Sequence, residues 1–230
     1  MKYSTIYIIP GYGIPKNIKI DDHYRHYLGA AFNKIFDLSK NQSLLCIFTG
    51  GRTDMIKPYR RNEASEMKNF FDDLSKRPAV IKATRPWKLI TETSALSTLE
   101  NILFSKKILD RKNVTEGKLI VFCEYSRAKK INTFVKKIFG STWKIKIIPI
   151  DFDISQNRYQ SELIAKRETY DIKIGIWALE NPKNLRICRT FLKDKLSYLR
   201  KNNFQNHPEA VKKYWETKLA ELDTLRKITK

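Results

Sequence analysis

The chain has 230 residues, of which 45 are lysine or arginine and 24 are aspartate or glutamate, so its net charge is +21. An apolar fraction of 42% excludes an intrinsically disordered protein and is typical of a globular protein with a real core. Three widely spaced cysteines exclude a disulfide framework, and no apolar run approaches the roughly 20 residues that span a bilayer. We therefore expect a cytoplasmic protein.

The positive charge favours anionic partners, namely nucleic acid, phosphate-bearing metabolites or acidic lipid surfaces. Lysine, asparagine and isoleucine are all abundant, which fits a compositionally biased genome equally well. The histidines do not indicate a metal site, because His23 and His26 are neighbours without a carboxylate cluster and His207 is distant.

Apolar strand-like runs alternate with helical patterns along the first 180 residues. The predicted strands cover 5–11, 44–51, 87–92, 118–124 and 144–150, with a further one at 172–178. The predicted helices cover about 23–39, 63–74, a segment from 98 onward, and 128–139. Continuously apolar strands are expected where helices cover both faces of a parallel sheet. The pattern predicts a three-layer, Rossmann-like α/β domain over residues 1–180 with a mostly parallel sheet.

Residues 181–230 change character and show two helical patterns without strands, with 13 basic and 5 acidic residues. We expect this basic helical extension to pack its apolar stripes on the α/β domain. The alternative is a basic amphipathic segment that lies on a membrane or grips a partner.

Ligands of such sheets bind beyond the carboxyl ends of the strands, so the turns there are the candidate site. In the first turn, Gly11 and Gly13 allow close approach of the backbone to an anion, although a plain tight turn fits as well. In the second turn, Gly50 and Gly51 precede a basic loop that suits phosphate or is simply solvated. The basic residues of that loop are Arg52, Lys57, Arg60 and Arg61.

The third turn crowds polar side chains between a strand and a helix. Ser97 and Glu100 fit a capping box, in which Ser97 caps the helix and Glu100 reaches back to it. Capping leaves Glu92, at the strand end, and Asn101, one turn into the helix, without an explanation. In the fourth turn, Glu124 and Arg127 flank another strand end. A cysteine phosphatase loop needs five residues between its cysteine and its arginine, but only three separate Cys123 from Arg127 and the matching position is Lys129, so we exclude Cys123 as a nucleophile.

The order of these turns resembles the YdcF, SanA and ElyC-like family of Rossmann-like domains of unknown function. The family signature after the third strand is Glu-x-x-Ser-x-x-Thr-x-Glu-Asn, and its glycine pair and Glu-Ala follow the second strand. The positions that match are Glu92, Ser94 or Ser97, Thr98, Glu100, Asn101, Gly50, Gly51, Glu63, Ala64 and, early in the first helix, Arg25. Many members have a histidine in the fourth turn, which Ser126-Arg127-Ala128 lacks.

The resemblance implies a small-molecule site, with nucleotide or S-adenosylmethionine binding suggested for some members. We expect a phosphate-bearing or nucleotide-like ligand, with Glu63, Glu92 and Glu100 as acid, base or hydroxyl-orienting groups. The expected ligand-binding residues are Gly11, Gly13, Arg25, Gly50, Gly51, Arg52, Ser94, Thr98, Asn101 and Arg127. If the protein is an enzyme, we expect a transferase or hydrolase. The alternatives are a nucleic-acid-binding protein that acts through its basic surface, and a non-catalytic interaction module.

Overall fold

A computed structural model describes residues 3–11, 13, 18–54, 57–151 and 161–201, together with Tyr214, Thr224 and Lys227. The chain divides into two compact units, Met1–Asp153 and Ile154–Lys230, and each is described by itself. Among the described residues, we find no helix with the length and apolar character that crossing a membrane requires.

The first unit is built on a five-stranded, all-parallel sheet with the strand order β3-β2-β1-β4-β5. The strands are β1 (Thr5–Pro10), β2 (Leu44–Thr49), β3 (Trp87–Glu92), β4 (Gly117–Glu124) and β5 (Trp143–Ile150). Every residue of the inner strands β1 and β2 is buried, as their continuous apolar sequences predict. The edge strand β5 instead exposes Lys144 and Lys146, which protect an open sheet edge from pairing with another chain.

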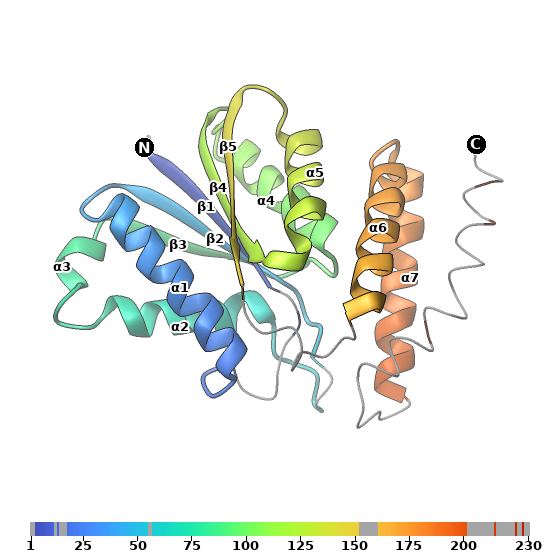
Figure 1. Ribbon diagram of the computed structural model, residues 1–230, viewed down its shortest axis with the longest axis horizontal. Coiled ribbons are helices and arrows are strands. Elements are labelled where there is room, and N and C mark those ends of the chain that lie inside the picture. Colours follow the sequence, from blue (N-terminus) through green and yellow to red (C-terminus); the bar gives the residue numbers. More distant parts are fainter. Residues whose placement is uncertain are drawn as a thin grey trace. The chain divides into compact units, whose positions relative to one another are not determined.

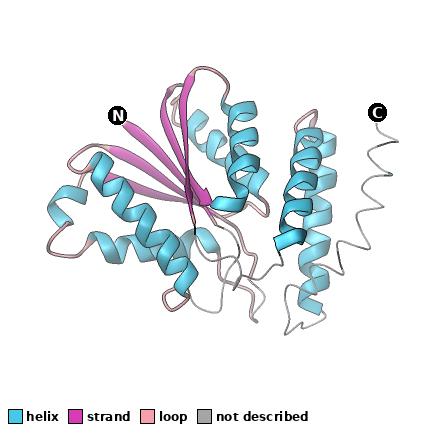
Figure 2. Cartoon of the chain, viewed as in Figure 1, coloured by secondary structure: helices cyan, strands magenta, loops and turns pink. Residues whose placement is uncertain are grey.

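Helices cover both faces of this sheet, so the first unit is a three-layer, Rossmann-like α/β domain (Figures 1 and 2). The helices are α1 (Asp22–Ser39), α2 (Glu63–Ser75), α3 (Ile81–Thr84), α4 (Thr98–Arg111) and α5 (Ala128–Phe139), and a single 3-10 turn, η1 (Tyr125–Arg127), precedes α5. On one face, Phe32 of α1 and Phe48 of β2 both pack their rings against Phe71 of α2. Helices α4 and α5 lie on the other face.

The sheet register brings the first three turns together. Pro10 is paired with Thr49, and Thr49 is paired with Glu92, so β1, β2 and β3 end in one row. The chain moves from β1 outward to β3, then crosses back to β4 on the other side of β1. The switch point of the topology therefore lies between the turns that follow Pro10 and Glu124, where ligands of open α/β sheets bind.

The second unit contains α6 (Ser161–Ala178) and α7 (Pro182–Lys201). The two helices contact each other, and the Asn184 side chain donates to the carbonyl of Trp177 at 3.0 Å. Asn181 caps α7 by accepting the amide of Asn184 at 2.9 Å. The first helical pattern of the extension is therefore confirmed, whereas most of the second lies outside the described residues.

The strand predicted at 172–178 is wrong, because these residues form the last turns of α6. A short apolar run rich in isoleucine cannot be told from a buried helix segment by periodicity alone. The charged segment before it continues into the same helix, so α6 falls in the second unit with α7 rather than in the α/β unit. Packing of the extension on the α/β domain stays a prediction.

Candidate functional site at the carboxyl edge of the sheet

Backbone hydrogen bonds tie the first three turns to one another. The amide of Gly11 donates to the carbonyl of Thr49 at 2.8 Å, and that of Gly50 donates to the carbonyl of Glu92 at 3.0 Å. The amide of Gly51 donates to the carbonyl of Ala95 at 2.7 Å. The turns after β1, β2 and β3 thus form one continuous layer at the carboxyl edge of the sheet.

Glu63, the first residue of α2, lies at the centre of this layer and is only 3% exposed. Its Oε1 accepts the amide of Gly13 at 2.5 Å and also accepts the hydroxyl of Tyr24 from α1. The hydroxyl of the adjacent Tyr27 donates to the carbonyl of Pro10 at 3.0 Å. A single buried carboxylate therefore links the first turn, α1 and α2.

Gly11 and Gly50 are glycines because the Glu63 side chain fills the space that a Cβ atom would need. A Cβ on Gly11 would lie 2.0 Å from the carboxyl carbon of Glu63, and one on Gly50 would lie 2.7 Å from its Oε2. We expected these glycines to approach a ligand, but the group they approach belongs to the protein. The amides of Gly11, Gly13, Gly50 and Gly51 all donate within the protein, so the expectation that they supply free amides to an anion is wrong.

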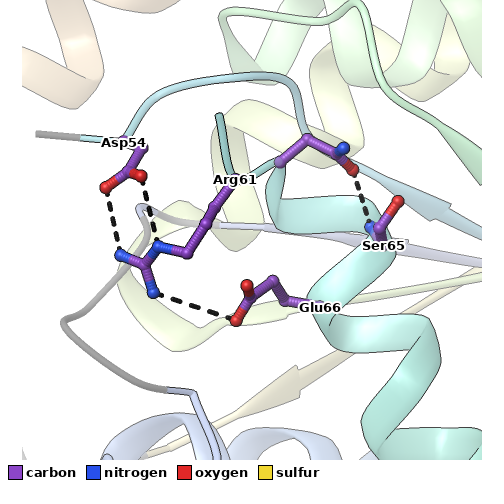
Figure 3. Close-up of polar contacts among 5 residues, drawn as sticks. Asp54, Arg61, Ser65 and Glu66 are labelled. Atoms are coloured by element: carbon purple, nitrogen blue, oxygen red, sulfur yellow. Dashed lines mark hydrogen bonds and ion pairs between the residues drawn. The ribbon is translucent and has the colours of Figure 1, made fainter. Parts of the chain in front are cut away.

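The basic loop between β2 and α2 is held by a buried ion pair (Figure 3). Asp54 is 2% exposed, and Arg61 donates to it from Nε at 3.2 Å and from Nη2 at 3.0 Å. The Nη1 of Arg61 lies 3.9 Å from Glu66 Oε2. The hydrogen bonds to Asp54 raise the pKa of Arg61, while partial burial opposes this.

Arg61 thus neither is simply solvated nor is left unneutralised for a phosphate, the two roles that the sequence left open for this loop. Its charge is balanced by a carboxylate that the sequence did not single out. Arg52 and Arg60 of the same loop are exposed, as is Lys57. A lone aspartate within an otherwise basic loop was the available signal for this ion pair.

In the third turn, the carboxylate of Glu92 folds back over its own turn instead of pointing into a crevice. Oε1 accepts the amide of Ser94 at 2.7 Å, and Oε2 accepts the amide of Ala95 at 3.1 Å. Ser97 caps α4 by accepting the amide of Glu100 at 3.2 Å, as predicted. The Glu100 carboxylate accepts the amide of Leu96 at 2.7 Å, one residue before the cap that we expected it to reach.

Burial raises the pKa of Glu92, and the two amide hydrogen bonds only partly offset this desolvation. The charge of Glu100 in the same turn raises the pKa further. The structure therefore supports easier protonation of Glu92. That property suits a general acid.

Two buried polar atoms on the α4 side of this edge have no hydrogen-bond partner among the described residues. They are the Oδ1 of Asn101, which is 4% exposed, and the Oγ1 of Thr49, which is fully buried. Thr49 faces α4 because Phe48, its neighbour in the strand, packs against α2 on the opposite face. Thr98, at the start of α4, is half-buried, and Ser94 is exposed.

The fourth turn repeats the carboxylate arrangement of the third. Glu124, 6% exposed at the end of β4, accepts the amide of Ser126 at 2.7 Å on Oε1 and the Ser126 hydroxyl on Oε2. The Nε of Arg127 lies 4.0 Å from Glu124 Oε2, so part of its charge is balanced. Tyr125 exposes its ring beside the switch point.

The remaining sequence-predicted residue, Arg25, lies near the start of α1, next to Tyr24. It is exposed, and its Nη1 lies 3.6 Å from Oδ1 of Asp22 on the same helix. In the described part of the chain, no three histidine, cysteine, aspartate or glutamate side chains are grouped as metal ligands.

No protein-family model, curated protein or solved structure matches the chain. The resemblance to the YdcF-like family therefore stays a prediction.

The close fit of Gly11 over Glu63 predicts that these residues are energetically coupled. Gly11→Ala should destabilise the protein by about 1–3 kcal/mol, because the new methyl group overlaps the carboxyl group. In the Glu63→Ala background, the same substitution should cost much less, since the three nearest atoms all belong to Glu63. Urea unfolding of the four proteins measures the coupling. Additive effects would show that Glu63 does not fill this space.

The raised pKa of Glu92 predicts a pH dependence of stability. Folded Glu92 holds its proton to a higher pH than unfolded Glu92. At a pH above both pKa values, the ionised carboxylate therefore lowers the stability of the folded protein. As the pH falls from about 8 to about 4, wild type should gain stability relative to Glu92→Gln. The measurement is urea unfolding of both proteins across this pH range. An opposite slope, with wild type losing stability relative to Glu92→Gln, would contradict the raised pKa.

Proposed function

We propose that the carboxyl edge of the sheet, at the first turn of α4, binds a phosphate-bearing or nucleotide-like small molecule. S-adenosylmethionine belongs to the same range of ligands, because it shares the nucleoside group. The observation that most supports this proposal is the buried Oδ1 of Asn101, which has no hydrogen-bond partner among the described residues.

An acceptor that is buried without a donor costs about 1–3 kcal/mol, so proteins seldom leave one in place. A ligand that donates an N–H or O–H to Asn101 would remove this cost. The unpartnered hydroxyl of Thr49, on the same side of the sheet, can accept or donate a second hydrogen bond. Hydroxyl and amino groups, such as those of a ribose and a base, provide the donors that this pair requires.

The phosphate part of the ligand would be held by side chains rather than by backbone amides. The glycine amides already donate to Thr49, Glu63, Glu92 and Ala95. Arg127, with its side chain 17% exposed beside the switch point, and the exposed Arg52 are the cations we assign to this role. These two cations would hold the phosphate, and Asn101 would accept a hydrogen bond from the nucleoside part of the proposed ligand.

If the site is catalytic, Glu92 is the residue we assign as general acid, in transfer or hydrolysis at a phosphoryl or glycosyl-type centre. Its pKa is raised by burial and by Glu100. However, both of its oxygens accept amides of its own turn, as the oxygens of Glu124 accept groups of the fourth turn. These contacts support binding more directly than catalysis, so binding is the function we propose.

The test is to replace Asn101 by leucine, which has a similar volume and no polar atom. The variant should be as stable as wild type or more stable, because it removes an unpaired buried acceptor. Its affinity for the ligand should fall at least about tenfold, since the donor on the ligand loses its partner. Thermal shift with ATP, a sugar nucleotide and S-adenosylmethionine identifies the ligand, and titration calorimetry measures affinity.

Ser105→Ala is the matched control, one turn further along α4. The buried hydroxyl of Ser105 donates to the carbonyl of Asn101 at 2.7 Å, so its loss should cost about 1 kcal/mol of stability but leave affinity unchanged. The proposal is wrong if none of the three compounds stabilises the protein, or if Asn101→Leu binds as tightly as wild type.

A further inference from the structure

Helix α7 concentrates positive charge within one element of the second unit. Between Pro182 and Lys201 it contains seven lysine or arginine residues and one acidic residue, Asp194. Packing of α7 against α6 does not by itself require this excess of positive charge. The arrangement of the charges on the helix shows whether they form a surface.

Six exposed residues of α7 follow one another at intervals of three or four, which places them on one side of the helix. They are Lys183, Arg186, Thr190, Lys193, Ser197 and Lys201. At 3.6 residues per turn they lie within roughly 80° of arc, and at 1.5 Å per residue they extend over about 27 Å. We call the four charged members, Lys183, Arg186, Lys193 and Lys201, the α7 cation stripe.

The cations of this stripe have no ion pair or hydrogen bond to a carboxylate in the described part of the chain. On two helices of the α/β unit the cations are neutralised, because Lys68 pairs with Asp72 on α2 and Lys106 pairs with Asp110 on α4. Asp194 lies next to the stripe but in none of these pairs. Four aligned, unneutralised cations repel one another, and a polyanion removes that repulsion.

We infer that the α7 cation stripe binds the phosphate backbone of a nucleic acid. Duplex DNA presents one phosphate charge per about 1.7 Å of axis, so about 27 Å of helix can follow a continuous line of phosphates. The uncharged residues on the same side of α7 are Thr190 and Ser197, so this side has no asparagine or glutamine to read adenine. Lysine and arginine commonly contact phosphate oxygens, so we assign the stripe to the backbone, with binding independent of base sequence.

An anionic membrane is the less suitable partner. A helix that lies on a bilayer inserts an apolar face between the headgroups. On α7, Leu185, Leu192 and Leu196 are partly buried and Leu199 is 4% exposed. The large hydrophobic residues exposed in the described chain are Ile20, Ile81 and Tyr125, none of which lies on α7. The described surface of α7 therefore offers a membrane its charge but no large exposed hydrophobic residue to insert. Binding to the phosphate backbone of a nucleic acid requires only the charge.

The test is fluorescence anisotropy of the full-length protein with a labelled duplex DNA of arbitrary sequence. Four phosphate contacts give a slope of about −3.6 in log affinity against log salt, or about 150-fold weaker binding between about 50 and 200 mM. Replacing all four stripe cations by glutamine should lower affinity at least about tenfold and make the slope shallower by about three to four. Circular dichroism checks that the variant is folded.

The control replaces Lys34, Lys40, Lys112 and Lys136 of the α/β unit by glutamine, which removes the same charge from exposed positions elsewhere. This variant should keep the slope of wild type. The inference fails if wild type does not bind duplex DNA, if the two variants weaken binding equally, or if vesicles of phosphatidylserine bind α7 cations in preference to DNA. A second DNA of unrelated sequence should bind equally, and a strong preference between the two would overturn backbone recognition.

Discussion

The carboxylate of Glu63 is the contact on which the carboxyl edge depends. It is buried at the start of α2 and accepts hydrogen bonds from the first turn and from Tyr24 of α1. A buried carboxylate is tolerated only when hydrogen-bond donors surround it. The amide of Gly13 and the hydroxyl of Tyr24 supply two of these donors, and this need holds both groups in position. The same side chain leaves no room for a Cβ on Gly11 or Gly50. Two glycine turns that look like ligand-binding loops are thereby explained by a tertiary contact inside the protein.

Glu92 and Glu124, at the ends of β3 and β4, are also buried carboxylates that accept hydrogen bonds from the protein. Glu92 accepts two amides of the turn that follows it, at 2.7 and 3.1 Å, and Glu124 accepts one amide of the next turn, at 2.7 Å. Three strand ends in a strongly basic protein are therefore closed by internal anions. One consequence is that a bound anion cannot use these amides, and a ligand must find donors and acceptors on side chains. Buried side-chain oxygens without a described hydrogen-bond partner at this edge include those of Asn101, Thr49 and Thr53.

The sequence was sufficient for features that depend on local pattern. Continuous apolar runs predicted β1 and β2 because both are buried on two faces, and Ser97 predicted the cap of α4 because its hydroxyl is three residues from the amide it accepts. Capping left Asn101 unexplained in the sequence, and the structure leaves its Oδ1 unpaired.

Features that depend on distant contacts were not predictable in the same way. The reason for Gly11 lies 52 positions away in Glu63, and Arg61 pairs with Asp54 across a loop whose path no periodicity describes. The segment at 172–178 was assigned to a strand because isoleucine-rich runs suit both structures, and only its continuity with residues 161–171 makes it a helix. Charge composition favoured anionic partners without distinguishing nucleic acid, small metabolites and lipid surfaces, and the alignment of Lys183, Arg186, Lys193 and Lys201 became visible only on the exposed face of α7.

Buried carboxylates hold the turns at the carboxyl edge in place before any ligand binds. Amide hydrogen exchange measured by NMR tests this most directly. The amides of Gly13, Ser94 and Ser126, bonded to Glu63, Glu92 and Glu124, should exchange about tenfold or more slowly than the amide of Thr93, which is exposed in the third turn. Exchange of all three amides as fast as that of Thr93 would contradict the account, because the carboxylates would then not be holding the turns.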